Sequence, residues 1–156
     1  MVDHARFTLG QRTEKFIKLQ WVFFMSTIKA KQARQDGIEL AFIEKVFARL
    51  PDHTEVLQAL AELYTKTGKY AEGLAIDFKL SLLLPNDDLV WYNLGCSYAL
   101  TRKFDEAFDA LAKSIDLGYG DYDWMKTDPD LGNLHADPRF DSLLNWLYTV
   151  CSEEEI

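Results

Sequence analysis

Residues 91–98 read Trp-Tyr-Asn-Leu-Gly-Cys-Ser-Tyr, and an Ala-x-x-x-Leu stretch begins at Ala107 after eight intervening residues. The same frame occurs 34 residues earlier without a gap, and Pro51 and Pro85 have the same separation. Two copies in register indicate an internal repeat that organises the middle of the chain. We take these matched positions as the repeat-defining core: Leu57, Leu60, Ala61 and Tyr64 in the first copy, and Trp91, Leu94, Gly95, Tyr98 and Ala107 in the second.

The spacing within each copy predicts a pair of helices. Large, small and large residues follow one another at intervals of three, one and three, which places them on one helical face. The small residues at 61 and 95, and their small counterparts at 73 and 107, let the second helix of each pair approach closely. We expect helices at about 53–66 and 70–84, then from a cap at Asn86 or Asp87 to about 101, and from 104 to before Gly118. No strands are predicted.

Local start and stop signals support these boundaries. Asp52 followed by Glu55 is the pattern of a capping box at the start of the first helix. Gly68 is placed to supply the left-handed turn after that helix. The acidic residues between 121 and 130 are interpreted as capping carboxylates in a tight linker. They do not form a calcium loop, because the glycine and glutamate that such a loop needs are absent from the required positions.

The second copy resembles the tetratricopeptide repeat signature almost position for position. The resemblance implies an all-α fold, a right-handed α-solenoid of about three antiparallel helix pairs with a long N-terminal helix, forming one domain over 1–156. Repeats are then expected at 52–85 and 86–119. The phrase Asp-Pro-Asp-Leu…Asp-Pro-Arg-Phe is similar to the segment that closes many bacterial arrays, so 120–150 is expected to be a degenerate closing repeat. Its last helix, at about 138–150, has one apolar face formed by Phe140, Leu143, Leu144 and Leu147.

Residues 13–50 are predicted to form a divergent helix pair or an N-terminal cap. A first helix over about 13–34 carries a core stripe, Asp36-Gly37 is expected to break it, and a second helix follows at 38–50. The stripe consists of Ile17, Trp21, Phe24 and Ile28. Apolar residues also lie off this stripe, at Phe16, Leu19 and Phe23. A helix that is apolar over most of its circumference is buried or paired, so a homodimer through this helix is one possible assembly.

Charge and composition exclude several classes of function. The chain has 17 basic and 25 acidic residues, net −8, which disfavours a nucleic-acid partner. Residues 1–50 carry net +4 and residues 51–156 net −12. The histidines have no metal-ligand spacing, no glycine-rich phosphate loop follows a strand, and no nucleophile stands beside a base. We therefore expect no enzyme activity, catalytic residue, metal or cofactor.

The sequence also bears on the compartment. Two cysteines give no disulfide framework and suit a reducing environment. The N-terminus lacks the apolar core of a signal peptide. The most apolar run, residues 21–25, is far shorter than the roughly 20 residues that a membrane span needs. A soluble, cytoplasmic protein without a membrane span is the expectation.

The resemblance to tetratricopeptide arrays also implies a site. In such arrays the first helix of each pair lines a concave groove. The corresponding groove residues here are Glu55, Gln58, Glu62 and Thr65, then Leu89, Tyr92, Asn93 and Cys96, with Ala99 at the end of the second set. One wall is acidic and the next is apolar with an aromatic ring. The expected partner is a protein or peptide segment with basic and apolar residues.

The function expected from these features is that of a protein–protein interaction module, an adaptor or scaffold without catalysis. Carboxylate-clamp co-chaperones are a poor match. They hold a carboxylate with cationic and amide residues, and only Asn93 is a counterpart of these in this chain. Two other roles remain open. One is a small acidic chaperone of the bacterial type III secretion kind, and the other is a homo-oligomeric assembly element.

Overall fold

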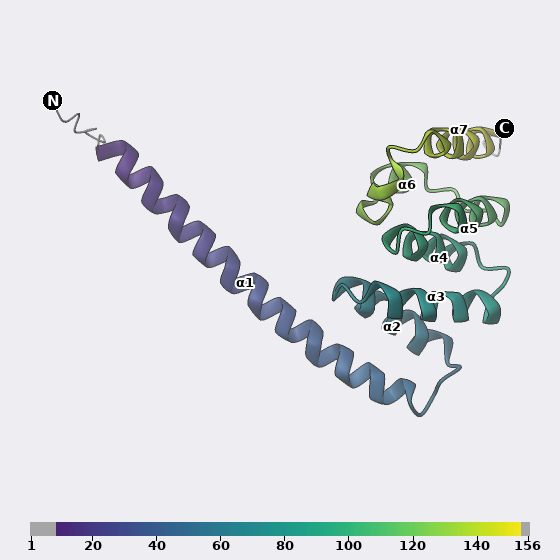
Figure 1. Cartoon of the computed structure of the whole chain (residues 1–156), viewed down its shortest axis with the longest axis horizontal. Helices are drawn as coiled ribbons and strands as arrows, with labels where there is room; N and C mark the ends of the chain where they lie inside the picture. Colours follow the sequence, from purple (N-terminus) through teal and green to yellow (C-terminus); the bar gives the residue numbers. More distant parts are fainter. Residues whose placement is uncertain (1–8, 154–156) are drawn as a thin grey trace. The chain divides into compact units, whose positions relative to one another are not determined.

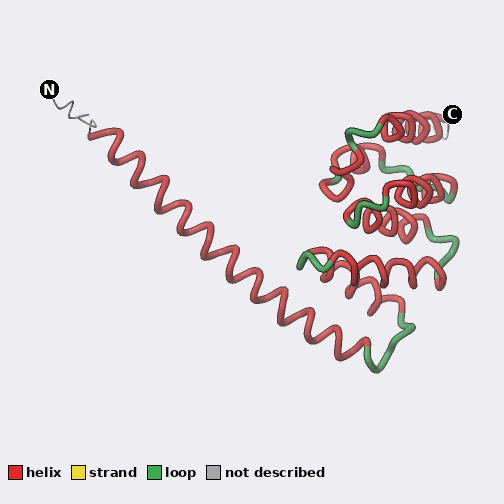
Figure 2. Tube along the Cα trace, in the orientation of Figure 1, coloured by secondary structure: helices red, strands yellow, loops and turns green. Residues whose placement is uncertain are grey.

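The computed structural model describes the backbone of residues 9–153 and the side chains of residues 18–152. Within this part of the chain every regular element is helical, as Figures 1 and 2 show. The all-α prediction is therefore confirmed. Contacts divide the chain into two compact units, 1–38 and 39–156. These are unit 1 and unit 2, respectively. No helix in the described part is long and apolar enough to cross a membrane.

The first element is one continuous helix, α1, Leu9–Phe47. The break predicted at Asp36-Gly37 is wrong, and with it the helix pair over 13–50. A glycine inside a helix costs only about 1 kcal/mol relative to alanine. Gln32 also donates to the Asp36 carboxylate one turn later (2.9 Å), an arrangement that supports the helix through this point.

The apolar residues of α1 are more exposed than predicted. Trp21, Phe24 and Ile28, expected to form a core stripe, are exposed, as are Leu19 and Phe23. The rings of Trp21 and Phe24 lie 6.0 Å apart on the same helix. The side chains of Phe16 and Ile17, also part of that prediction, lie outside the described side chains.

Unit 2 reproduces the 34-residue repeat in its helix boundaries. The helices are α2, Thr54–Lys66, α3, Tyr70–Leu83, α4, Asp88–Leu100, and α5, Phe104–Asp116. Both ends of α2 and α4 differ by 34 residues, and so do the starts of α3 and α5. Each helix packs on the next in chain order. The four helices predicted in this region are therefore confirmed within one or two residues.

The turns inside the two pairs are also equivalent. The amide of Lys69 donates to the carbonyl of Tyr64 (2.8 Å), and that of Lys103 donates to the carbonyl of Tyr98 (2.9 Å). Gly68 has a φ of 76°, as predicted, and the residue 34 positions later, Arg102, has a φ of 62°. Both turns thus require the left-handed conformation, which glycine adopts at low steric cost.

Replacement of Gly68 by alanine should lower the unfolding free energy by about 1 kcal/mol, because a Cβ is strained at positive φ although the space around it is open. Gly132→Ala is the matched control, since a Cβ at Gly132 would also meet open space but this residue has no positive φ. Urea unfolding of the two variants measures the difference. If both substitutions lower the unfolding free energy equally, the positive φ of Gly68 is not the cause of the destabilisation.

The predicted capping box at Asp52 and Glu55 is wrong. The cap residue of α2 is His53, whose side chain makes no capping hydrogen bond. Glu55 instead lies 3.0 Å from the His53 imidazole, and Asp52 pairs with Lys79 on α3 at 2.7 Å. The helix begins one residue later than the box requires, so Asp52 is too far out to reach its amides. Asp87, one of the two predicted alternatives, caps α4 by accepting from the amide of Val90.

Gly95 permits close packing of α4 against α5. A Cβ built on Gly95 of α4 would lie 2.7 Å from Cγ of Leu111 and 2.8 Å from its Cδ2, on α5. The prediction that this position must be small is therefore confirmed. The equivalent pair in the first copy is Ala61 and Asp77. The first copy therefore has a larger residue where the second has Gly95, and a carboxylate where the second has Leu111.

Most of the repeat-defining residues are buried. The aliphatic and small members are all buried, whereas the three aromatic members are half-buried. Their polar atoms explain part of this difference: the Trp91 indole donates to the carbonyl of Pro85 (2.9 Å), and the Tyr64 hydroxyl donates to Glu44 (3.1 Å). Such residues keep a polar end near solvent or a partner while burying the ring.

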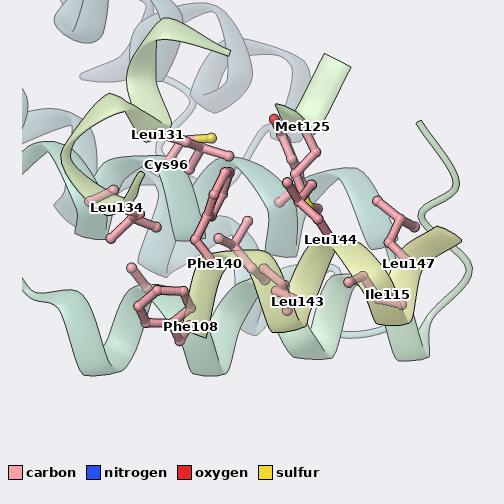
Figure 3. Close-up of a cluster of buried hydrophobic side chains, with 14 of the residues drawn as sticks. Cys96, Phe108, Ile115, Met125, Leu131, Leu134, Phe140, Leu143, Leu144 and Leu147 are labelled. Atoms are coloured by element: carbon pink, nitrogen blue, oxygen red, sulfur yellow. The ribbon is translucent and has the colours of Figure 1, made fainter. Parts of the chain in front are cut away.

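The C-terminal segment packs on the end of the second pair. It consists of α6, Tyr122–Thr127, the 3-10 helix η1, Pro129–Leu134, and α7, Pro138–Glu153, which contacts α5 and α6. The expected apolar face of the last helix is confirmed, because its four predicted residues are buried in the cluster of Figure 3. The capping interpretation is confirmed for Asp121 and Asp128, which accept hydrogen bonds from the amides of Trp124 and Asp130.

Candidate partner-binding cavity

A cavity of about 750 Å³ lies in unit 2 between α2, α3, α4 and the α6–η1 segment. Seven of the nine predicted groove residues line it, whereas Glu55 and the fully buried Ala99 do not. Glu55 lies on the exposed first turn of α2, beside His53. The lining residues that the prediction found are Gln58, Glu62, Thr65, Leu89, Tyr92, Asn93 and Cys96.

Helix α4 presents one continuous face to this cavity. Leu89, Asn93, Cys96 and Leu100 follow one another at intervals of four, three and four, so they lie on one side of the helix. Leu89 is 57% exposed, and Trp124 on α6 is 51% exposed. Large apolar side chains are therefore available to a ligand on two elements that border the same cavity.

A buried hydrogen-bond network fixes one side of the cavity. The carboxylate of Asp128, 4% exposed, accepts from the Tyr92 hydroxyl (2.7 Å) and the Cys96 thiol (3.7 Å). The Tyr92 ring stacks on Tyr119 with centroids 4.3 Å apart. Burial raises the pKa of Tyr92 and of Cys96 well above their ordinary values. Both groups therefore stay neutral near pH 7, and Cys96 is a donor rather than a nucleophilic thiolate.

Burial changes the role expected for Tyr92. The sequence predicted its ring as an aromatic contact for a partner, but only 3% of the residue is exposed. Its stacking on Tyr119 and its bond to Asp128 instead position the cavity wall. Trp124 is the exposed aromatic residue at the cavity, and sequence reasoning did not include it because it lies in the short α6 outside the two clear copies.

Asp77 lies on the other side of α4 from this network. It is 4% exposed, lines the cavity, and accepts a hydrogen bond from the Ser97 hydroxyl at 2.5 Å. Burial raises the pKa of Asp77 to about 6, and the bond from Ser97 offsets part of that effect. The aligned position in the second copy is Leu111. The first copy therefore has a carboxylate where the second has a core leucine.

The pKa of Asp77 predicts a pH dependence of stability. Its folded-state pKa of about 6 exceeds the ordinary 3.8, so the folded chain holds this proton more tightly than the unfolded chain. The Asp77 contribution should therefore favour folding below pH 4 and be lost as the pH rises through about 6, a change of about 3 kcal/mol. Urea unfolding from pH 4 to pH 7.5 should show this change in the native chain.

The variant Asp77→Asn isolates the contribution of this one group. It removes the titration, so the difference in unfolding free energy between variant and native chain should shift in the variant's favour as the pH rises. Subtraction is needed because other carboxyl groups titrate in the same range. Asp130 is one such group, because burial and nearby Asp128 raise its pKa. If the unfolding free energies of the variant and the native chain change with pH in parallel, Asp77 is not responsible for the pH dependence of stability.

The cavity is acidic as well as apolar. Glu62, Asp77, Asp128 and Asp130 line it, and Lys66 is the basic residue among its described lining residues. Side chains of one charge in a concave, partly apolar site concentrate ligands of the opposite charge. Among the residues whose side chains are described, no three His, Cys, Asp or Glu are arranged to hold a metal ion. The arrangement is suited to an organic cation next to apolar groups.

Another apolar cavity, of about 440 Å³, borders α3, α4 and α5. Phe78 and Leu82 on α3 line it and are exposed, and Trp91 and Tyr98 of the repeat-defining set also line it. None of the predicted groove residues contributes to this cavity. It is an alternative location for binding.

Comparison with known proteins gives limited information. No protein-family model matches the chain. The chain is similar to a chloroplastic protein of Arabidopsis thaliana, with 30% identity over 84 residues. The aligned region is 52% of this chain and 25% of that protein, so the chain matches about a quarter of the relative's length.

Proposed function

We propose that this protein is a non-catalytic protein–protein interaction module of the tetratricopeptide repeat kind, acting as an adaptor or scaffold. In this proposal α2–α3 and α4–α5 are two repeats of a right-handed α-solenoid, and α6, η1 and α7 are its closing repeat, giving about three antiparallel helix pairs. The support is the 34-residue offset of helix ends together with the equivalent turns at 64–69 and 98–103.

The cavity between α2, α3, α4 and α6–η1 is the observation that carries the functional proposal. Its carboxylates favour a partner segment with basic residues, and exposed Leu89 and Trp124 favour an apolar anchor on that segment. Charged groups at a solvated rim, such as Glu62, mainly set the association rate and weaken with salt. A large aromatic contact mainly sets the dissociation rate.

The test uses a short amphipathic helical peptide with leucines on one face and lysines beside it. A matched peptide with glutamate in place of lysine is the control. We expect the basic peptide to bind and the acidic peptide not to bind. Trp124→Ala should speed dissociation, and Glu62→Lys should slow association and flatten its salt dependence, as measured by biolayer interferometry.

The control protein for this test is Phe78→Ala, which alters the other cavity. It should bind the basic peptide like the native chain. Equal binding of both peptides, or insensitivity of the rates to both cavity substitutions, would argue against this site. Circular dichroism of each variant checks that its helices are retained.

A homo-oligomeric assembly element is the second candidate, favoured by the exposed apolar residues of α1. Leu19, Trp21, Val22 and Phe23 are each more than 60% exposed, in a run that is apolar over most of the helix circumference. Size-exclusion chromatography with light scattering distinguishes the candidates. A stable dimer that dissociates on Trp21→Glu favours assembly, and a monomer that binds the basic peptide favours the adaptor.

A further inference from the structure

One carboxylate that lines the cavity has no counterpart at the equivalent position of the other repeat. Asp77 lies inside α3 at the position where α5 has the fully buried Leu111. A buried carboxylate destabilises a fold unless a cation or several hydrogen bonds compensate it. An apolar residue at this position is compatible with the same pair of helices, as α4 and α5 demonstrate. The fold alone therefore does not explain the carboxylate.

The compensation that Asp77 receives is incomplete. Its Oδ2 accepts from the Ser97 hydroxyl, and its Oδ1 accepts no hydrogen bond from the side chains and amides that the structure describes. The ion pairs formed by described residues do not include Asp77. The residue is only 4% exposed and still lines the cavity. Asp77 therefore borders a space that a ligand can enter and has one carboxylate oxygen without a partner among the described groups.

Other carboxylates also line this cavity. Asp128 lies on the opposite flank of α4, held by Tyr92, while Ser97 holds Asp77 on the near flank. Tyr92 and Ser97 are five residues apart, so they point to different sides of the helix, and the cavity-lining residues Asn93 and Cys96 lie between them. Asp130 also lines this space.

We propose that one arginine of the bound segment enters the cavity over Asn93 and donates to the free oxygen of Asp77, while apolar residues of the same segment rest on Leu89 and Trp124. Arginine fits because its planar guanidinium is less strongly hydrated than an ammonium group and can donate two parallel hydrogen bonds to a carboxylate. This inference rests on the proposed function, and it makes Asp77 the residue that determines specificity.

The experiment replaces lysine by arginine, one position at a time, in the amphipathic peptide of the preceding test. Each arginine peptide is paired with one that has citrulline, a neutral isostere, at the same position. Calorimetry should show one position at which arginine binds about tenfold tighter than citrulline, as expected for a hydrogen-bonded charge pair.

The protein variant is Asp77→Leu combined with Ser97→Ala, which introduces the apolar residue of the second copy and leaves no hydroxyl without a partner. The preference for arginine should fall to about onefold in this variant, within error, while its urea midpoint rises above that of the native chain because a buried charge is removed. A variant that loses the preference for arginine while its urea midpoint rises cannot have lost that preference by unfolding. Asp116→Asn, an exposed carboxylate outside the cavity, is the control and should keep the preference.

Three other results would overturn the inference. Arginine and citrulline peptides that bind equally at every position would overturn it and leave the proposed function intact. An arginine preference that is retained in the double variant would also overturn the inference. If no basic peptide binds the native chain, the proposed function fails together with the inference.

Discussion

Replacement of Gly95 by leucine should unfold unit 2 or lower its unfolding free energy by more than about 2 kcal/mol. Even a Cβ at this position would lie 2.7 Å from Cγ of Leu111, a side chain with no exposed surface. The larger leucine would force α4 and α5 apart at this contact. The melting temperature should fall by at least about 4–8 °C for a domain of this size.

Two further variants show whether the clash with Leu111 is responsible. Gly95→Ala alone should be destabilising, and Leu111→Ala in the same chain should add less than its separate cost, because the two changes share one space. Gly132→Ala, at a glycine with open space, should have little effect. A melting temperature for Gly95→Leu within about a degree of the native value would mean that the α4–α5 packing described above is incorrect.

The second large effect is expected for Asp128→Ala, which should lower the unfolding free energy by about 2–3 kcal/mol. The change removes the acceptor of the Tyr92 hydroxyl, the Cys96 thiol and the Asp130 amide at once. A buried donor that loses its partner costs about 1–3 kcal/mol, and relief from burying a charge offsets part of the total. Urea denaturation measures the change.

Asp121→Ala provides the comparison for this variant, because Asp121 also caps a helix but is exposed. Its loss should cost about 1 kcal/mol or less. Adding Tyr92→Phe to Asp128→Ala should recover part of the lost stability, since the hydroxyl without a partner is removed. Equal costs for the two aspartates, with no recovery from Tyr92→Phe, would contradict the network described above.

Helices α2 to α5 were predictable because a repeat in register supplies the same information twice. The spacing of Leu57 to Tyr64 and of Trp91 to Tyr98 determined both helix faces, and Gly95 marked the close contact. Local signals were less reliable. Asp36-Gly37 did not end α1, because the cost of one glycine inside a long helix is small. Asp52 did not cap α2, because the helix begins one residue later than the sequence pattern indicates.

The cavity was predictable only in part. The repeat frame located seven of its lining residues, but the burial of Tyr92 depends on Tyr119, which lies outside the α4 pattern. Trp124 lies in a segment with no clear repeat signature. Alignment of the two copies places Asp77 at the position of Leu111, so the unusual aspartate could be recognised from the sequence. The alignment does not show that this residue lines a cavity.

The most direct test of the binding proposal is to locate the bound basic peptide by NMR. Amide and indole shifts of the isotope-labelled protein would be recorded during a titration with this peptide. We expect the largest changes at Glu62, Asn93 and the Trp124 indole, which all line one cavity. Changes confined to α1, or to Phe78 and Leu82 at the other cavity, would contradict it.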